Sequence, residues 1–172
     1  MTKKEMTELF SVMLLAWPNA EMFRGGIAKL GPTVELWAAC TADVDFWTGQ
    51  QAVIRLCKTC KFPPTIAEFR EQVDAVNADI RSKYNAMFQI IRSADLMYGS
   101  VEAYCQSLLP GSFNREVIDR MGGPENLVIT WEHNGEKCSR WNTDGLEAAC
   151  TAVIRGHNAI TGGQSKALAA KK

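Results

Sequence analysis

The sequence predicts a mainly α-helical protein, and three observations support this fold class. Apolar residues recur at spacings of three and four through most of the chain, as they do on one face of a helix. Hydroxyl–carboxylate pairs of the capping-box type stand just before two of these apolar runs. Prolines and glycines separate the runs. We therefore expect a compact N-terminal helical domain, followed by a long helix and a smaller helical C-terminal domain with a flexible tail.

The N-terminal domain is predicted to contain four short helices before the long one. Thr2 and Glu5 have the spacing of a capping box, which opens the first helix. Asn19 is expected to cap the second helix, and Pro32 stands at the start of the third. Asp43 is expected to cap the fourth. Short helices with tight connections favour a globule over a long antiparallel bundle.

The clearest local signal is the run Lys61-Phe-Pro-Pro-Thr-Ile-Ala-Glu68. Its two prolines force an extended approach to the next element, because each restricts the residue before it. Thr65 and Glu68 form a second capping box, and Phe62 is placed to pack near the helix start. The following apolar stripe predicts a helix to Leu96, about 48 Å long at ~1.5 Å per residue. The alternative is a break near Asn77–Asp79, where either residue could cap a new helix.

The second half of the chain gives weaker signals. Helices are expected over residues 100–109 and 113–121, each ended by glycine and proline. The β-prone run 127–131 predicts either a small hairpin or more helix. Thr143 is expected to cap a last amphipathic helix, and a loose tail follows from Gly156. The predicted divisions are a helical domain of residues 1–76, a helical domain of residues 77–155 and a tail of residues 156–172.

Charge and hydropathy exclude some classes of protein. The chain has 19 basic and 19 acidic residues, whereas a protein that binds nucleic-acid phosphates usually has a basic excess. Strong direct binding to nucleic acid is therefore disfavoured. The longest uncharged stretch near the start, Leu9–Ala20, is too short to span a bilayer, and no signal peptide is visible. We expect a soluble cytoplasmic protein with free thiols.

Cys57 and Cys60 are the obvious candidates for metal or redox chemistry. A structural zinc site needs four ligands, and Cys138, Cys150 and His157 do not supply a second close pair. A redox pair is expected at a helix start, whereas this one stands at a predicted helix end, where the helix dipole raises the thiol pKa. The two cysteines are interpreted as small apolar core residues.

No catalytic group or cofactor site is predicted elsewhere. Neither histidine, His133 or His157, stands in a pattern that indicates a nucleophile and its base. The glycine-containing run 156–166 lacks the spacing of a phosphate-binding loop. We therefore expect a protein that is not an enzyme and has no catalytic residues, bound metal or cofactor.

Tryptophan positions suggest where a partner protein would bind. Trp17, Trp37 and Trp47 follow the helical apolar phase and are expected in the core. Trp131 and Trp141 fall in the less regular half and are candidate exposed anchors for protein contacts. Leu168 is a third candidate, because a flexible tail can become ordered on a partner.

The first ~75 residues resemble the phage replicative-helicase loader/inhibitor family. The resemblance rests on the opening Thr2-Lys-Lys-Glu-Met, on Trp17-Pro18, on the helices of Trp37 and Phe46-Trp47, and above all on the run 61–68. More weakly, the second half resembles the C-terminal halves of longer phage proteins that carry this domain.

This resemblance implies a helical N-terminal domain and a partly disordered C-terminal region. It also implies a partner, a replicative DNA helicase, which such proteins hold inactive and deliver to an origin-bound replication protein without using a nucleotide of their own. Two alternatives remain: an origin- or DNA-binding replication-initiation protein, which a basic face on the second domain would favour, and a small zinc-binding regulator.

The single Cys-x-x-Cys pair leads to a first testable prediction. Purified protein is expected to carry no stoichiometric metal, because one pair at a helix end lacks the remaining ligands of a tetrahedral site. Elemental analysis checks this directly. About one zinc per chain, with helicity lost on chelation, would contradict the prediction and favour the zinc-binding alternative.

Overall fold

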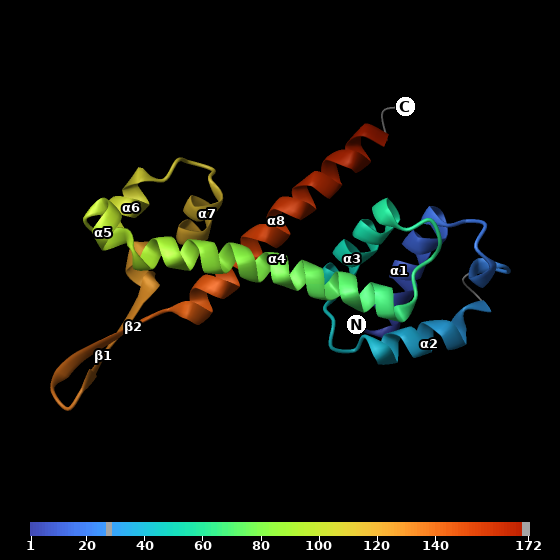
Figure 1. Ribbon diagram of the computed structural model, residues 1–172, viewed down its shortest axis with the longest axis horizontal. Helices are drawn as coiled ribbons and strands as arrows, with labels where there is room; N and C mark the ends of the chain where they lie inside the picture. The colour runs from blue at the N-terminus through green and yellow to red at the C-terminus, as the bar shows by residue number, and fades with distance from the viewer. Residues whose placement is uncertain (27–28, 170–172) are drawn as a thin grey trace. The chain divides into compact units, whose positions relative to one another are not determined.

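The computed structural model describes residues 1–26 and 29–169, with side chains described as far as residue 156 (Figure 1). The chain is 69% helical, and its described residues form eight α-helices and one two-stranded sheet. The mainly α prediction is therefore confirmed. The chain divides into two compact units, residues 1–79 and residues 80–172. This division lies three residues beyond the predicted boundary.

The first unit consists of short helices around one core. Its elements are α1 Lys3–Ala16, η1 Glu21–Phe23, α2 Gly31–Cys40, α3 Phe46–Thr59 and the first part of α4 Ile66–Arg92. The Thr2–Glu5 capping box is present, as predicted, with both reciprocal hydrogen bonds. Over the described part of the predicted second helix, residues 21–23 form a 3-10 turn, and residues 27–28 lie outside the described residues. Gly25 and Gly26 follow it at φ +99° and +76°, a left-handed backbone that does not continue a right-handed helix.

The predicted cap of the fourth helix, Asp43, was wrong by two residues. The Asp45 side chain caps α3, accepting a hydrogen bond of 3.1 Å from the Thr48 backbone N–H. Asp43 instead forms a two-armed ion pair with Arg70, with both N–O distances at 2.9 Å. The Arg70 guanidinium holds the pKa of Asp43 below its ordinary value. This carboxylate joins the α2–α3 connection to α4.

Aromatic rings contributed by three helices meet in the core of the first unit. Phe10 of α1 and Trp37 of α2 lie 5.3 Å apart between ring centroids at 87°, and Trp37 and Phe69 of α4 lie 5.6 Å apart at 61°. Edge-to-face pairs of this kind stabilise by about 0.5–1.5 kcal/mol beyond the area that they bury. Trp17 and Trp37 are buried as predicted, whereas Trp47 is only half-buried.

The amino group of Met1 closes the loop between α2 and α3. It donates hydrogen bonds to the backbone carbonyl oxygens of Thr41 (2.8 Å), Ala42 (3.1 Å) and Val44 (2.6 Å). The Met1 side chain is buried against α3 at Gly49, where an added Cβ would lie 2.8 Å from the Met1 sulfur. The glycine therefore allows the chain start to approach α3.

The long helix is continuous. α4 runs unbroken from Ile66 to Arg92, so the predicted alternative of a break near residues 77–79 is wrong, and the helix ends four residues before Leu96. Asp79 lies inside this helix instead of capping a new one, and its carboxylate pairs with Arg55 of α3 at 2.5 Å. The helix stops where the Ser93 hydroxyl donates to backbone carbonyl oxygens of the last turn.

The second unit packs short helices and the C-terminal half of α4 around its own core. The remaining elements are α5 Ala94–Tyr98, α6 Val101–Ser107, α7 Phe113–Arg120, η3 Pro124–Leu127, β1 Val128–His133, β2 Glu136–Trp141 and α8 Thr143–Ala169. Buried residues include Met87, Ile91, Val117, Leu146 and Cys150. Of the two predicted readings of run 127–131, the hairpin is the correct one. Asn142, one residue before the predicted Thr143, supplies the side chain that caps α8.

The predicted tail falls mostly on residues whose side chains are not described. The backbone of α8 is helical to Ala169, beyond the predicted tail start at Gly156. Side chains from residue 157 onward, including Leu168 and His157, lie outside the described residues.

The separate core of the first unit leads to a second prediction. A chain of residues 1–79 is expected to fold alone, because its aromatic cluster, its two capping boxes and the Arg55–Asp79 ion pair all lie within that range. Thermal unfolding followed by circular dichroism should be cooperative. A molten or insoluble product would show that the two units depend on one another for folding.

A third prediction concerns the capping box of α4. Thr65→Ala should lower the free energy of unfolding of the first unit by about 1 kcal/mol, because it removes the hydroxyl that accepts from the Glu68 N–H. Thr59→Ala, which removes an exposed hydroxyl that caps no helix start, is the matched control. Urea titrations of the full chain measure both.

Lowering the pH should reduce the contribution of the Thr65–Glu68 capping box to the free energy of unfolding. The Thr65 backbone N–H, and then its hydroxyl, hold the pKa of Glu68 below its ordinary value. A carboxyl whose folded pKa is depressed stabilises above its unfolded pKa, and that stabilisation is lost as pH falls through the folded pKa. The difference between Thr65→Ala and the unmodified chain should therefore shrink below about pH 4. A difference that stays constant down to pH 2 would contradict this account of Glu68.

Candidate protein-interaction surfaces

Of the Cys-x-x-Cys pair, Cys60 packs against the core of the first unit, whereas Cys57 does not, which corrects the prediction for Cys57 alone. Cys57 is exposed near the end of α3 and Cys60 is half-buried just beyond it. Partial burial of the sulfur raises the pKa of Cys57. Within the described part of the chain, no three His, Cys, Asp or Glu side chains are grouped as metal ligands. The pair therefore stands alone at a helix end.

The other cysteines and the described histidine do not form a nucleophilic site. Cys105 and Cys150 are buried, and burial raises the pKa of Cys150 to about 11. A thiol with so high a pKa is protonated at neutral pH and is a poor nucleophile. His133 is exposed at the end of β1, next to the hairpin turn.

The hairpin presents one exposed apolar face. Asn134 and Gly135 both have positive φ, +52° and +79°, as a two-residue turn between antiparallel strands requires. Ile129 and Trp131 lie on one face because alternate residues of a strand point the same way. They are 38% and 44% exposed, large values for such apolar side chains. Cys138 stands opposite Trp131 on the same face.

Trp141 lies on the opposite face of the hairpin and faces the core. Its partner across the ribbon is Val128, at the base of the hairpin. The indole is half-buried and meets the Phe88 ring of α4 edge to face, with centroids 6.2 Å apart at 89°. Of the candidate anchor residues, Trp131 is therefore exposed, Trp141 is partly buried in the core, and Leu168 lies outside the described side chains.

Exposed apolar residues of the first unit are further candidates for partner contacts, and the sequence did not predict them. Leu15 of α1 is 82% exposed, and Val12, on the same face one turn earlier, is 43% exposed. Phe62 is 71% exposed, so the prediction that it packs near the start of α4 was wrong. The prolines after Phe62 hold this segment extended, and Lys61 Nζ lies 5.8 Å from its ring centroid. Exposed side chains of this size are typical of protein contacts.

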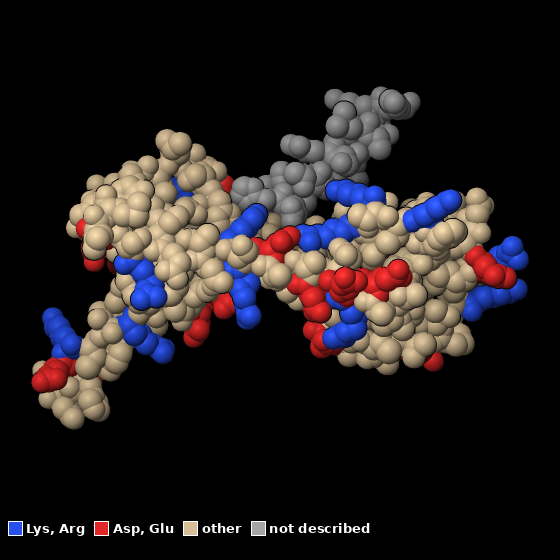
Figure 2. Space-filling model, in the orientation of Figure 1, with Lys and Arg blue, Asp and Glu red and all other residues tan. Residues whose placement is uncertain are grey.

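Charged groups are mixed on the visible face of the molecule. Figure 2 shows Lys and Arg interspersed with Asp and Glu over the described residues of both units. No broad basic face of the kind that would favour the DNA-binding alternative is seen in this view. Among the described helices, none is both long enough and apolar enough to cross a membrane.

Comparison with known proteins gives one match, and it lies in the N-terminal unit. That unit is similar to a domain found in a phage replication protein. In particular, the family model of the N-terminal domain of the phage gene 39 protein matches residues 1–70. The resemblance inferred from the capping boxes, the tryptophans and the run 61–68 is thereby confirmed. Neither the search of curated proteins nor the search of solved structures found a match.

Proposed function

We propose that this chain binds a replicative DNA helicase, holds it inactive, and delivers it to an origin-bound replication protein. The observation that carries the proposal is the match of residues 1–70 to the N-terminal domain of the gene 39 protein. In this proposal the chain acts by binding other proteins rather than by catalysis, and it does so in the cytoplasm of a bacterial host.

The exposed apolar side chains of the first unit support a binding role for that unit. Leu15, Phe62 and Leu36 are each more than half exposed. Burying apolar surface is favourable by roughly 25 cal/mol per Å². A partner that covers these side chains would therefore gain binding free energy from them. Because they belong to the family-matched segment, we assign them the first contact with the helicase.

The hairpin is the second proposed contact. Trp131 presents a large rigid side chain on a ribbon whose strands each keep one unpaired backbone edge. Tryptophan is enriched among residues that dominate binding energy, because it buries much area with little loss of side-chain freedom. Trp141 is not proposed as an anchor, since its ring already packs on Phe88. The C-terminal segment with Leu168 stays a third candidate.

Titration of a purified replicative helicase with the purified chain tests the function. ATPase and unwinding rates should fall as the chain is added, with no nucleotide bound by the chain itself. Helicase activity unchanged at saturating concentrations, with no complex seen by size-exclusion chromatography, would overturn the proposal.

Variants separate the proposed contacts. Phe62→Ala and Trp131→Ala should each weaken inhibition roughly tenfold or more if they are central anchors. Leu109→Ala, a 75%-exposed apolar residue of the second unit outside both surfaces, is the matched control. A chain stopped at Arg155 tests the C-terminal segment, and inhibition equal to that of the full chain would exclude only that contact.

A further inference from the structure

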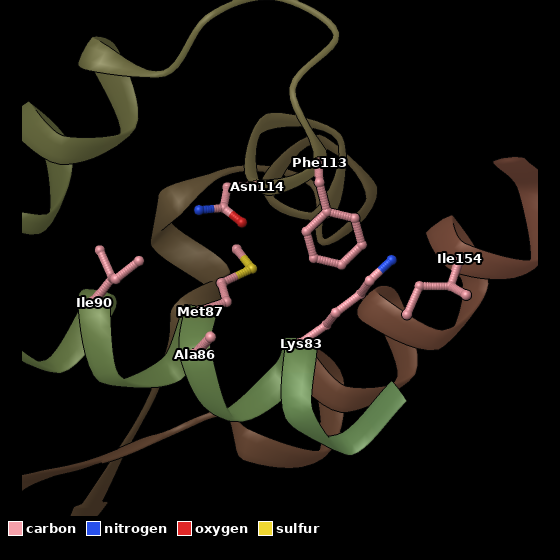
Figure 3. Close-up of a pocket in the computed structure, with 7 residues that line it drawn as sticks. All are labelled: Lys83, Ala86, Met87, Ile90, Phe113, Asn114 and Ile154. Atoms are coloured by element: carbon pink, nitrogen blue, oxygen red, sulfur yellow. The ribbon is translucent and has the colours of Figure 1, made fainter. Parts of the chain in front are cut away.

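The second unit has a groove that plays no part in the proposed function. It lies between the C-terminal half of α4, the start of α7 and the middle of α8, and has a volume of about 420 Å³ (Figure 3). It is open on one side rather than enclosed. The lining side chains are Lys83, Ala86, Met87, Ile90, Phe113, Asn114 and Ile154.

The walls of the groove are apolar, and two polar groups lie at its edges. Of the seven lining residues that the structure describes, Lys83 alone is charged, and its Nζ lies 5.6 Å from the centroid of the Phe113 ring. The amide nitrogen of Asn114 donates to the Tyr104 hydroxyl at 2.8 Å. That bond leaves the amide oxygen as an acceptor, and Figure 3 shows this oxygen on the Phe113 side of the side chain. A cation and an acceptor therefore flank one apolar hollow.

We propose that this groove binds an acidic amphipathic segment of a partner protein. An apolar side chain of the segment fills the hollow over Met87 and Phe113. A neighbouring carboxylate pairs with the Lys83 ammonium, and an N–H of the segment donates to the Asn114 oxygen. Laying the apolar face of a helix into such a groove, with polar groups at the rim, is a recurring mode of peptide recognition. This site goes beyond the proposed helicase contacts, which lie on other residues.

Charge complementarity identifies the occupant. Among the described lining residues there is a cation and no carboxylate, so an acidic partner gains a favourable contact and a basic one does not. The segment that follows Ile154 in the same chain, residues 157–172, carries three lysines and no acidic side chain. Its charge has the same sign as Lys83, which disfavours this segment as the ligand.

A synthetic peptide pair tests the proposal on the full chain. The probe is a fluorescein-labelled amphipathic peptide of about 16 residues, with leucines at helical spacing and glutamates on the other positions. The matched peptide has lysine in place of each glutamate. Fluorescence anisotropy should show binding of the acidic peptide at least about tenfold tighter, weakening as salt is raised. Equal affinity for the two peptides, or no binding of the acidic one, overturns the proposal.

The location of binding is read from methionine methyl resonances and from charge variants. The Met87 methyl signal should shift when the acidic peptide is added, whereas that of Met6, in the core of the first unit, should not. Lys83→Gln should weaken binding and Lys83→Glu should weaken it further, by about tenfold. Arg81→Glu, the same reversal on the same helix outside the lining, should leave affinity within about twofold. Thermal melts confirm that each variant is folded.

Other occupants are distinguished by the same measurements. A shift of Met87 on removal of residues 156–172, together with tighter peptide binding, would show that the chain's own segment fills the groove and would overturn the assignment. Displacement of the peptide by self-association, seen by sedimentation, would do the same in favour of a second copy. Loss of helicase inhibition without loss of peptide binding would affect the proposed function alone.

Discussion

The apolar stripe of α4 is the constraint on which both cores depend. Its first part places Phe69 and Val73 in the core of the first unit, and its last part places Met87 and Ile91 in the core of the second. Such a stripe stays continuous along a helix when apolar residues recur at three- and four-residue spacings without interruption. A proline near residue 78 would therefore interrupt the stripe that both cores use. The capping box at Thr65 fixes where this stripe begins.

Local signals predicted the helix starts well because they depend on neighbouring residues alone. Both capping boxes form as the Thr–Glu spacing indicates. Asp43 could not be assigned in the same way, because its competing partner, Arg70, is 27 residues away and the sequence does not show their proximity. Asp79 also has a distant partner, Arg55, which the sequence does not show, while α4 stays unbroken because its apolar stripe continues through residues 77–79. In both cases the partner of the carboxylate is distant in the sequence.

The candidate surfaces were less predictable than the helices. Trp131 was identified because it falls outside any helical stripe, whereas Trp141 resembled it in sequence and differs only through its contact with Phe88. Leu15 was missed because α1 is apolar on more than one side, so spacing alone does not reveal which leucine is buried. The groove beside Lys83 could not be predicted from the sequence, because its lining residues come from three helices. Those of α7 and α8 meet α4 only in the folded chain.

The hydrogen bonds at the base of the hairpin have a consequence for protein engineering. Asn142 N–H donates to the Leu127 carbonyl at 2.8 Å, and the Asn142 side-chain amide donates to the Asn126 carbonyl at 2.9 Å. These hydrogen bonds join the residues just before β1 to the residue just after β2. Leu127, before the ribbon, and Leu146, after it, both lie in the core of the second unit. Most of the ribbon can be lengthened, shortened or exchanged with little change to the packing beneath it. Such a segment is a natural position for grafting a foreign binding loop, because the core residues beneath it keep their contacts.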